Sequence, residues 1–315
     1  MSRRLMVLSP ALIVLLLTVS FAGCGSGGQK KVSDNRAFFE SQPLQKVQVG
    51  DIEMACKSFG EGQPLFMIPA FAMTMDVWDP VFLEELSTEY RVIIFDNRGM
   101  GETTSGTREW TIDQFADDTA GLIETLGYRS AFVLGWSVGG DIALSLAVNH
   151  PERVIKLISY AGDCGGTQKV EAPEYREVLA EVQDVDAPLK RVLVSLFPPE
   201  WMDEHPDYWK DFPFPKEHSS PKSIGRQDLA YETWEGVYDR LPDIDKPVLV
   251  VGGTEDVSTP PENLGILGSR IPGCWVVRYW GAGHGLQYQY PTDFAGQIVD
   301  FIDAPPTQAD TTGAD

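Results

Sequence analysis

The chain has 315 residues, enough for one large domain or two small ones, and 43% of them are hydrophobic, as in a globular protein with a sizeable core. Its formal net charge of −21 at pH 7 leaves no basic stripe to meet phosphates, which argues against nucleic acid as a partner and against charge-driven binding to anionic lipid. A solvated acidic surface that aids solubility is the simpler interpretation.

The first segment has the features of an export signal. Arg3 and Arg4 form a basic start, and residues 5–22 form a hydrophobic stretch that serine, threonine and proline dilute. Such dilution is typical of a signal peptide rather than of a permanent membrane span. Loss of the two arginines on cleavage would take the formal charge from −21 to about −23.

The end of that stretch, Phe21-Ala22-Gly23-Cys24, resembles the lipobox of bacterial lipoproteins, although these usually carry leucine where this chain has phenylalanine. The resemblance implies a signal peptide over residues 1–23, lipid on Cys24 and a tether over residues 24–43. The protein would then be exported and anchored to a membrane on the extracytoplasmic side. An uncleaved anchor, or a plain signal peptide that gives a secreted or periplasmic soluble protein, is the alternative.

Short apolar runs and helical repeats alternate through residues 44–303, the expected folded domain. A hairpin is expected at residues 44–59, and buried strands at 64–68, 91–95, 131–135, 154–160, 247–251 and 275–279. Helices are expected at 80–86, 112–126, 141–149, 262–269 and 292–302. Such alternation predicts an α/β fold in which a mostly parallel central sheet carries helices on both faces.

Two segments break this alternation. Residues from about 163 to 245 lack a strand signal and are rich in proline, tryptophan and acidic residues, which indicates an inserted helical cap. Helical runs are expected within it near residues 175–182, 189–196 and 224–238. Its aromatic residues are Phe197, Trp201, Tyr208, Trp209, Phe212, Phe214, Tyr231, Trp234 and Tyr238. They are expected either to contact an apolar part of a substrate or, more simply, to pack the cap on itself. For Trp136, next to Ser137, the choice between substrate contact and packing is open in the same way. Residues 304–315 are expected to be a disordered tail.

The sequence Gly135-x-Ser137-x-Gly139 stands between an apolar run and a helical repeat. A strand, a sharp turn with serine at its tip and then a helix are the layout of a nucleophile elbow. An ordinary glycine-rich turn between a strand and a helix would show the same pentapeptide. The choice between the two interpretations therefore depends on residues elsewhere in the chain.

Acidic and basic residues follow two later strands. Asp256 comes after the strand at 247–251, and His284, between glycines, comes after the strand at 275–279. Residues at the carboxyl ends of parallel strands share one edge of the sheet. A serine hydroxyl needs a base within hydrogen-bond reach, and that base needs a carboxylate to set its tautomer. Glu255 and Asp163 are the rival carboxylates, but Asp256 fits the strand-end spacing best.

Residues from about 44 to 303 are similar to the α/β-hydrolase family. The resemblance rests on four motifs: Asp96-Asn-Arg-Gly-Met-Gly101, Gly135-Trp-Ser-Val-Gly-Gly140, Gly253-Thr-Glu-Asp256 and Gly281-Ala-Gly-His284-Gly285. It implies that Ser137 is the nucleophile, Asp256 the acid and His284 the base.

An oxyanion hole is the remaining part that the resemblance implies, formed by the backbone N–H groups of Val138 and Phe71. Family members commonly carry His-Gly where this chain has Pro69-Ala70. Alanine at position 70 allows fewer backbone angles than glycine, which puts the geometry of this loop in question.

The expected activity is that of a serine hydrolase, which cleaves carboxylic esters, lactones or thioesters of small molecules through an acyl-enzyme. No cofactor and no metal are implied, and no Cys-x-x-Cys pair suggests a zinc site. The alternatives are a cofactor-free perhydrolase of the haloperoxidase type that uses the same triad, and a non-catalytic surface lipoprotein of the same fold. The sequence leaves the natural substrate open, and any disulfide among Cys56, Cys164 and Cys274.

Overall fold

The computed structural model describes residues 37–172, 187–208, 212 and 219–305. The predicted signal peptide, Cys24, the tail from residue 306 and the predicted helical run near residues 175–182 lie outside these ranges. Within them, every helix is too short or too polar to span a bilayer.

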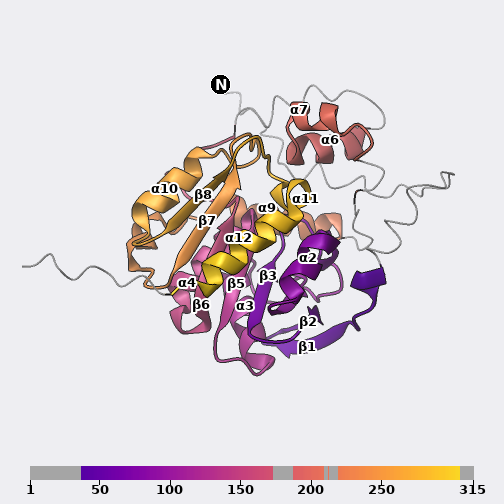
Figure 1. Ribbon diagram of the computed structural model, residues 1–315. Coiled ribbons are helices and arrows are strands. Elements are labelled where there is room, and N and C mark those ends of the chain that lie inside the picture. Colours follow the sequence, from indigo (N-terminus) through magenta and orange to yellow (C-terminus); the bar gives the residue numbers. More distant parts are fainter. Residues whose placement is uncertain (1–36, 173–186, 209–211, 213–218, 306–315) are drawn as a thin grey trace, which may run out of the picture.

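One eight-stranded sheet forms the centre of the protein (Figure 1), in the order β1-β2-β4-β3-β5-β6-β7-β8. The strands are β1 (Gln45–Val49), β2 (Ile52–Phe59), β3 (Pro64–Ile68), β4 (Arg91–Phe95), β5 (Ala131–Trp136), β6 (Val154–Tyr160), β7 (Val248–Gly253) and β8 (Trp275–Tyr279). The pairs of β1 with β2 and of β2 with β4 are antiparallel, and all other pairs are parallel. This is the mostly parallel α/β sheet that the alternation predicts.

Helices cover both faces of the sheet (Figure 1). The core on one face contains residues of α3 (Ile112–Thr125), α4 (Val138–Asn149) and α10 (Glu262–Arg270). The core on the other face contains residues of α2 (Pro80–Ser87), α11 (Leu286–Gln289) and α12 (Pro291–Asp303). Because β3, β5 and β7 lie between these layers, every residue in them is buried, as their continuous apolar runs predict. Short 3₁₀ turns lie at Met75–Val77, Pro151–Arg153 and Tyr238–Asp243.

Between β6 and β7 the chain forms helices rather than strands in the described residues. They are α6 (Ala187–Leu196), α7 (Pro199–Glu204) and α9 (Pro221–Glu232). The last of these begins earlier and ends earlier than the helical run expected at 224–238, because Ser220 caps its first turn through Ser223 and the chain turns at Thr233.

The packed body begins before Leu44, where the sequence placed its start. Residues 37–40 form one helical turn, and the rings of Phe38 and Phe39 lie 5.1 and 6.1 Å from that of Phe59. Lys57 Nζ also donates a hydrogen bond to the Phe39 carbonyl oxygen at 3.1 Å. These contacts shorten the predicted tether to residues 24–36.

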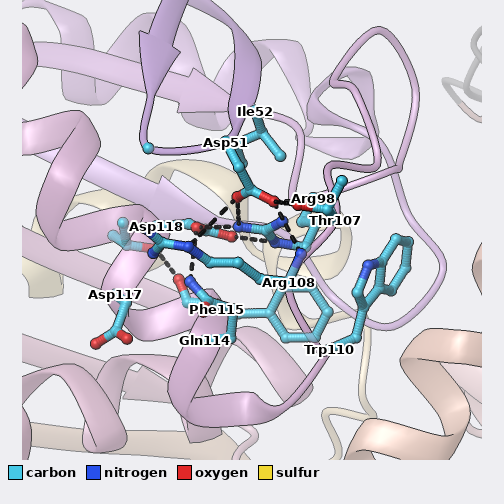
Figure 2. A network of polar contacts seen from close by, with 12 residues as sticks. Asp51, Ile52, Arg98, Thr107, Arg108, Trp110, Gln114, Phe115, Asp117 and Asp118 are labelled. Carbon is cyan, nitrogen blue, oxygen red and sulfur yellow. Dashed lines mark hydrogen bonds and ion pairs between the residues drawn. The ribbon is translucent and has the colours of Figure 1, made fainter.

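A buried guanidinium joins the hairpin edge of the sheet to α3 (Figure 2). Arg98 follows β4 and has no exposed surface. Its Nε and Nη2 atoms donate to the two carboxylate oxygens of Asp118 at 2.8 and 2.7 Å, and Nη2 also donates to Asp51 at 2.9 Å. The hydrogen bond from Arg98 holds the pKa of Asp51 well below its usual range. The interaction of Asp51 with Arg98 therefore stabilises the fold fully at pH values above the pKa of an ordinary aspartate. This stabilisation is lost as the pH falls below that pKa.

We expect Arg98→Met to lower the free energy of unfolding by about 3–5 kcal/mol, because it leaves the buried Asp118 carboxylate without its cation. Urea unfolding would measure the loss. Adding Asp118→Asn should recover part of it, since the stranded charge is then gone. Lys46→Met is the control, because it breaks an exposed ion pair with Glu102 and should cost about 1 kcal/mol or less. Equal effects of Arg98→Met and Lys46→Met would contradict the structural role of Arg98.

Candidate active site

Ser137 stands in a strained turn between β5 and α4. Its φ of 56° and ψ of −124° are unusual for a residue with a side chain, and its N–H donates to the Tyr160 carbonyl oxygen at 2.8 Å. Two glycines make the turn possible. A Cβ on Gly135 would lie 1.9 Å from the Gly139 carbonyl oxygen, and one on Gly139 would lie 2.3 Å from that of Ile68. The local sequence therefore produces the geometry of a nucleophile elbow.

The loop after β3 reaches the elbow because the sheet register pairs Ile68 with Gly135. Residues Ala70–Met73 form a turn that the Met73 N–H closes by donating to the Ala70 carbonyl oxygen at 3.2 Å. The positive φ of this turn, 59°, falls on Ala72. The sequence-based concern about Ala70 was therefore placed on the wrong residue, since Ala70 is not among the positive-φ residues of the described chain.

Two backbone N–H groups in this region are available to an oxyanion. Val138 is the first residue of α4, so its N–H has no acceptor within the helix. The Phe71 N–H has no acceptor among the described residues. Both residues line the cavity that also contains Ser137 and His284. The helix dipole of α4 adds to the preference of this position for negative charge.

His284 and Asp256 form a buried pair, with their side chains 8% and 2% exposed. His284 Nδ1 lies 2.8 Å from Asp256 Oδ2. The other carboxylate oxygen, Oδ1, accepts the N–H groups of Ser258 and Thr259 at 2.9 and 2.8 Å. The Asp256 carboxylate is thus held on three sides in one orientation, which fixes the face it turns to the imidazole.

The two rival carboxylates, Glu255 and Asp163, have partners other than His284. Glu255 is exposed, and its recorded side-chain partner is the Thr254 hydroxyl at 3.5 Å. Asp163 is buried and lines the same cavity as Ser137, but it accepts hydrogen bonds from the Gly165 N–H at 2.7 Å and from the Tyr231 hydroxyl at 3.3 Å. The structure therefore brings Asp256, and neither rival, to His284.

Two further side chains hold the backbone of His284. The Trp136 indole N–H and the Tyr160 hydroxyl both donate to the His284 carbonyl oxygen, at 3.1 and 2.5 Å. Their rings stack on each other 5.7 Å apart and 7° from parallel. Sequence reasoning left the role of Trp136 open and did not single out Tyr160. The one available signal was position, because each is the last residue of its strand.

A family model described as alpha/beta hydrolase fold matches residues 63–291. The chain belongs to the α/β-hydrolase family. A protein of Caulobacter sp. (strain K31), named as a candidate carbamate hydrolase, RutD, is 26% identical over 236 residues, which are 71% of this chain and 85% of that protein.

Solved structures of the family superpose on most of this α/β-hydrolase. A thermophilic esterase from Thermogutta terrifontis is 25% identical, with a TM-score of 0.69 over 82% of this chain and 98% of the esterase. The enol-lactonase of Burkholderia xenovorans LB400 is 21% identical, with a TM-score of 0.70 over 82% of this chain and 100% of the lactonase. The second likeness shows the fold alone. The family match, the relative named for carbamate hydrolysis and the esterase make the chain a hydrolase of the α/β fold.

The cavity of this α/β-hydrolase has a volume of about 210 Å³. Phe71, Trp136 and Val138 contribute apolar surface to its lining, whereas Asp163 and Lys169 contribute ionisable groups. Lys169 Nζ lies 3.0 Å from the Tyr231 hydroxyl. A space of this size accepts a small acyl or alcohol group.

Most of the described cap aromatics pack the cap on itself. The Phe197 ring lies 4.7 Å from Trp201, 4.9 Å from Tyr208 and 6.2 Å from Phe212. Of the nine aromatic residues named from the sequence, Tyr231 lines the cavity, and Trp209 and Phe214 lie outside the described residues. An aromatic lid over the substrate is therefore the weaker interpretation.

In the part of the chain that the structure describes, no group of three or more His, Cys, Asp or Glu side chains is arranged to hold a metal ion. Cys56, Cys164 and Cys274 are all free thiols, the first two of them buried.

Proposed function

We propose that Ser137, His284 and Asp256 act as a catalytic triad and that this α/β-hydrolase cleaves small carboxylic esters, lactones or thioesters. The observation that carries the proposal is the buried His284–Asp256 pair on the cavity of a strained serine. Two backbone N–H groups on the same cavity, those of Phe71 and Val138, supply the oxyanion hole.

The proposed reaction follows from which atoms are engaged. Asp256 accepts a hydrogen bond from the Nδ1–H of His284, which leaves Nε2 with the lone pair that a base needs. His284 takes the proton of Ser137 as its oxygen attacks the carbonyl carbon, and the N–H groups of Phe71 and Val138 bind the oxyanion. The protonated His284 then gives its proton to the leaving alcohol. His284 then deprotonates a water as its oxygen attacks the carbonyl carbon of the acyl-enzyme. The protonated His284 returns that proton to the Ser137 oxygen as the acid leaves, so Ser137 and neutral His284 are restored.

Other substrates share this mechanism. A carbamate presents the same carbonyl carbon to the serine, and the names of relatives at about 26% identity bring carbamates into the proposal. The perhydrolase alternative differs in one step, because hydrogen peroxide instead of water takes the acyl group. A panel of p-nitrophenyl esters of increasing acyl length, with lactones, thioesters, carbamates and peracid formation beside it, would rank these activities. Failure of a fluorophosphonate probe to label the wild-type serine would favour the non-catalytic alternative.

We propose further that the enzyme is an extracytoplasmic lipoprotein anchored through Cys24. The support is the Phe21-Ala-Gly-Cys24 sequence after a hydrophobic stretch. Because residues 37–40 pack on the body, 13 residues remain as tether, which reach at most roughly 45 Å when extended. The body would then stay within about its own diameter of the membrane surface.

We expect the native protein to fractionate with membranes, to resist release by high salt and to be released by detergent. Its formal charge of about −23 after loss of Arg3 and Arg4 offers no attraction to anionic lipid, so acyl chains must hold it. Cys24→Ser should give an unprocessed precursor or a soluble product, while Cys274→Ser, which changes a free thiol of the body, should leave fractionation unchanged. An intact mass that corresponds to an unmodified chain starting at Cys24 or later would refute the anchor and leave the catalytic proposal untouched.

A further inference from the structure

A side chain of the cap helix α9 holds the loop that contains Phe71. Gln227 has no exposed surface, and its Oε1 accepts the N–H of Ala72 at 2.7 Å. The two residues are 155 positions apart in the chain. Among the described residues, this contact is the side-chain hydrogen bond that holds the Ala70–Met73 turn.

The conformation that Gln227 holds is an unfavourable one for alanine. Ala72 is the third residue of its turn and has a φ of 59°, where turns of this kind prefer glycine because a Cβ crowds the backbone. Gln227 Nε2, the other half of the amide, has no hydrogen-bond partner among the described residues. A buried amide that leaves its NH₂ group without an acceptor costs stability, so its contact with Ala72 points to a role in the loop rather than in the packing of α9.

The direction of the Phe71 N–H depends on the two planar peptide units that meet at Phe71. The Phe71 N–H shares the first unit with the Ala70 carbonyl, whose oxygen accepts the Met73 N–H. The second unit contains the Phe71 carbonyl and the Ala72 N–H, and Gln227 holds it. With both units held, the torsions of Phe71 are set, and its free N–H points in one direction.

We propose that Gln227 is a positioning residue for the oxyanion hole: through Ala72 it aims the Phe71 N–H at the developing oxyanion. This assignment rests on the proposed serine hydrolase function. Gln227 touches no reacting atom. Through this contact the cap takes part in the oxyanion hole, because α9 carries the acceptor, Gln227 Oε1, and the loop after β3 carries the turn.

The first test is Gln227→Met, which keeps the length of the side chain and removes the acceptor. We expect kcat for p-nitrophenyl acetate to fall about 10- to 100-fold, less than the full loss of one oxyanion donor, with KM changed by less than about threefold. The rate of labelling by a fluorophosphonate should fall in parallel. Gln227→Glu retains an acceptor at the same reach and should keep most of kcat.

The decisive variant is Ala72→Gly in the Gln227→Met background. Glycine adopts a positive φ without the cost that alanine meets, so the turn no longer needs the hydrogen bond to Gln227. We expect kcat to rise at least about fivefold above that of Gln227→Met alone. If Gln227 only packed α9, a substitution in the loop would not restore kcat. Ile224→Val, which removes a buried methyl group from α9 and keeps Gln227, is the control and should leave kcat within about threefold.

Three outcomes would overturn the assignment while the wild type is active: kcat of Gln227→Met within threefold of wild type, a loss that appears in KM alone, or no rescue by Ala72→Gly. Melting temperatures identify a variant that merely fails to fold. Gln227→Asn, one methylene group shorter and too short to reach Ala72, then replaces Gln227→Met. A wild type that neither hydrolyses esters nor reacts with the probe would instead refute the proposed function, and this assignment with it.

Discussion

Ser137→Ala should lower kcat for ester hydrolysis at least about 10³-fold. The variant keeps the cavity, the His284–Asp256 pair and the oxyanion donors, but it has no oxygen to form the acyl-enzyme. Some activity over the uncatalysed reaction should persist, because the remaining groups still bind the substrate and stabilise an oxyanion formed by water. Alanine has the same backbone restrictions as serine, so the strained turn at φ 56° is no more costly in the variant.

The measurement is the rate with p-nitrophenyl acetate at saturating substrate, together with labelling by a fluorophosphonate, which should be lost. Ser258→Ala is not a suitable control, because Ser258 lines the same cavity and its hydroxyl donates to the Ser195 carbonyl oxygen. Ser269→Ala is suitable, since Ser269 is on α10 and its hydroxyl donates to the Ile266 carbonyl oxygen. Ser137→Ala activity within tenfold of wild type would refute the nucleophile.

Asp256→Asn should lower kcat by about 10⁴-fold, as the same exchange does in other Ser-His-Asp triads. The amide oxygen of the variant is held by the N–H groups of Ser258 and Thr259, because only oxygen can accept them. The amide NH₂ must therefore face His284. It donates to Nδ1, which moves the imidazole proton to Nε2 and removes the lone pair that accepts the serine proton.

Glu255→Gln is the matched control for that variant, because it changes an adjacent, exposed carboxylate in the same way and should leave kcat within about twofold. Near-normal folding of Asp256→Asn, checked by its melting temperature, would separate the tautomer effect from a loss of structure. If Asp163→Asn abolished activity while Asp256→Asn left it intact, the acid would be Asp163 instead.

The parts of the site that were predictable are those set by neighbours in the chain. The elbow at Ser137 depends on a strand, two glycines and a helix within a few residues, and each leaves a local sequence pattern. His284 and Asp256 were found by the same logic, since both follow apolar strands and parallel strands end at one edge of the sheet. The α/β fold itself was predictable because its buried strands are continuous apolar runs.

Other contacts had no local pattern to reveal them. Trp136 and Tyr160 meet the His284 carbonyl oxygen from 148 and 124 residues away. The sequence indicated Ala70 as the residue with restricted backbone angles, whereas the positive φ falls on Ala72, two residues later. Gln227, which accepts the Ala72 N–H, lies in a cap helix, and its distance from this loop depends on how the cap folds. Backbone carbonyls and N–H groups carry no sequence signature, so bonds to them appear only once the chain is folded.

The sequence by itself determined the α/β architecture, the position of the elbow, the candidate nucleophile and base, and a preference for Asp256 among three carboxylates, because strand periodicity, glycine placement and strand-end order are encoded locally. Only the tertiary structure decided which carboxylate pairs with His284, where the strain of the Phe71 loop falls and which cap residue holds it. The physical reason is that Asp256 and Glu255 have the same chemistry and adjacent positions. What separates them is the direction of a side chain, and that is set by packing and hydrogen bonds between distant parts of the chain.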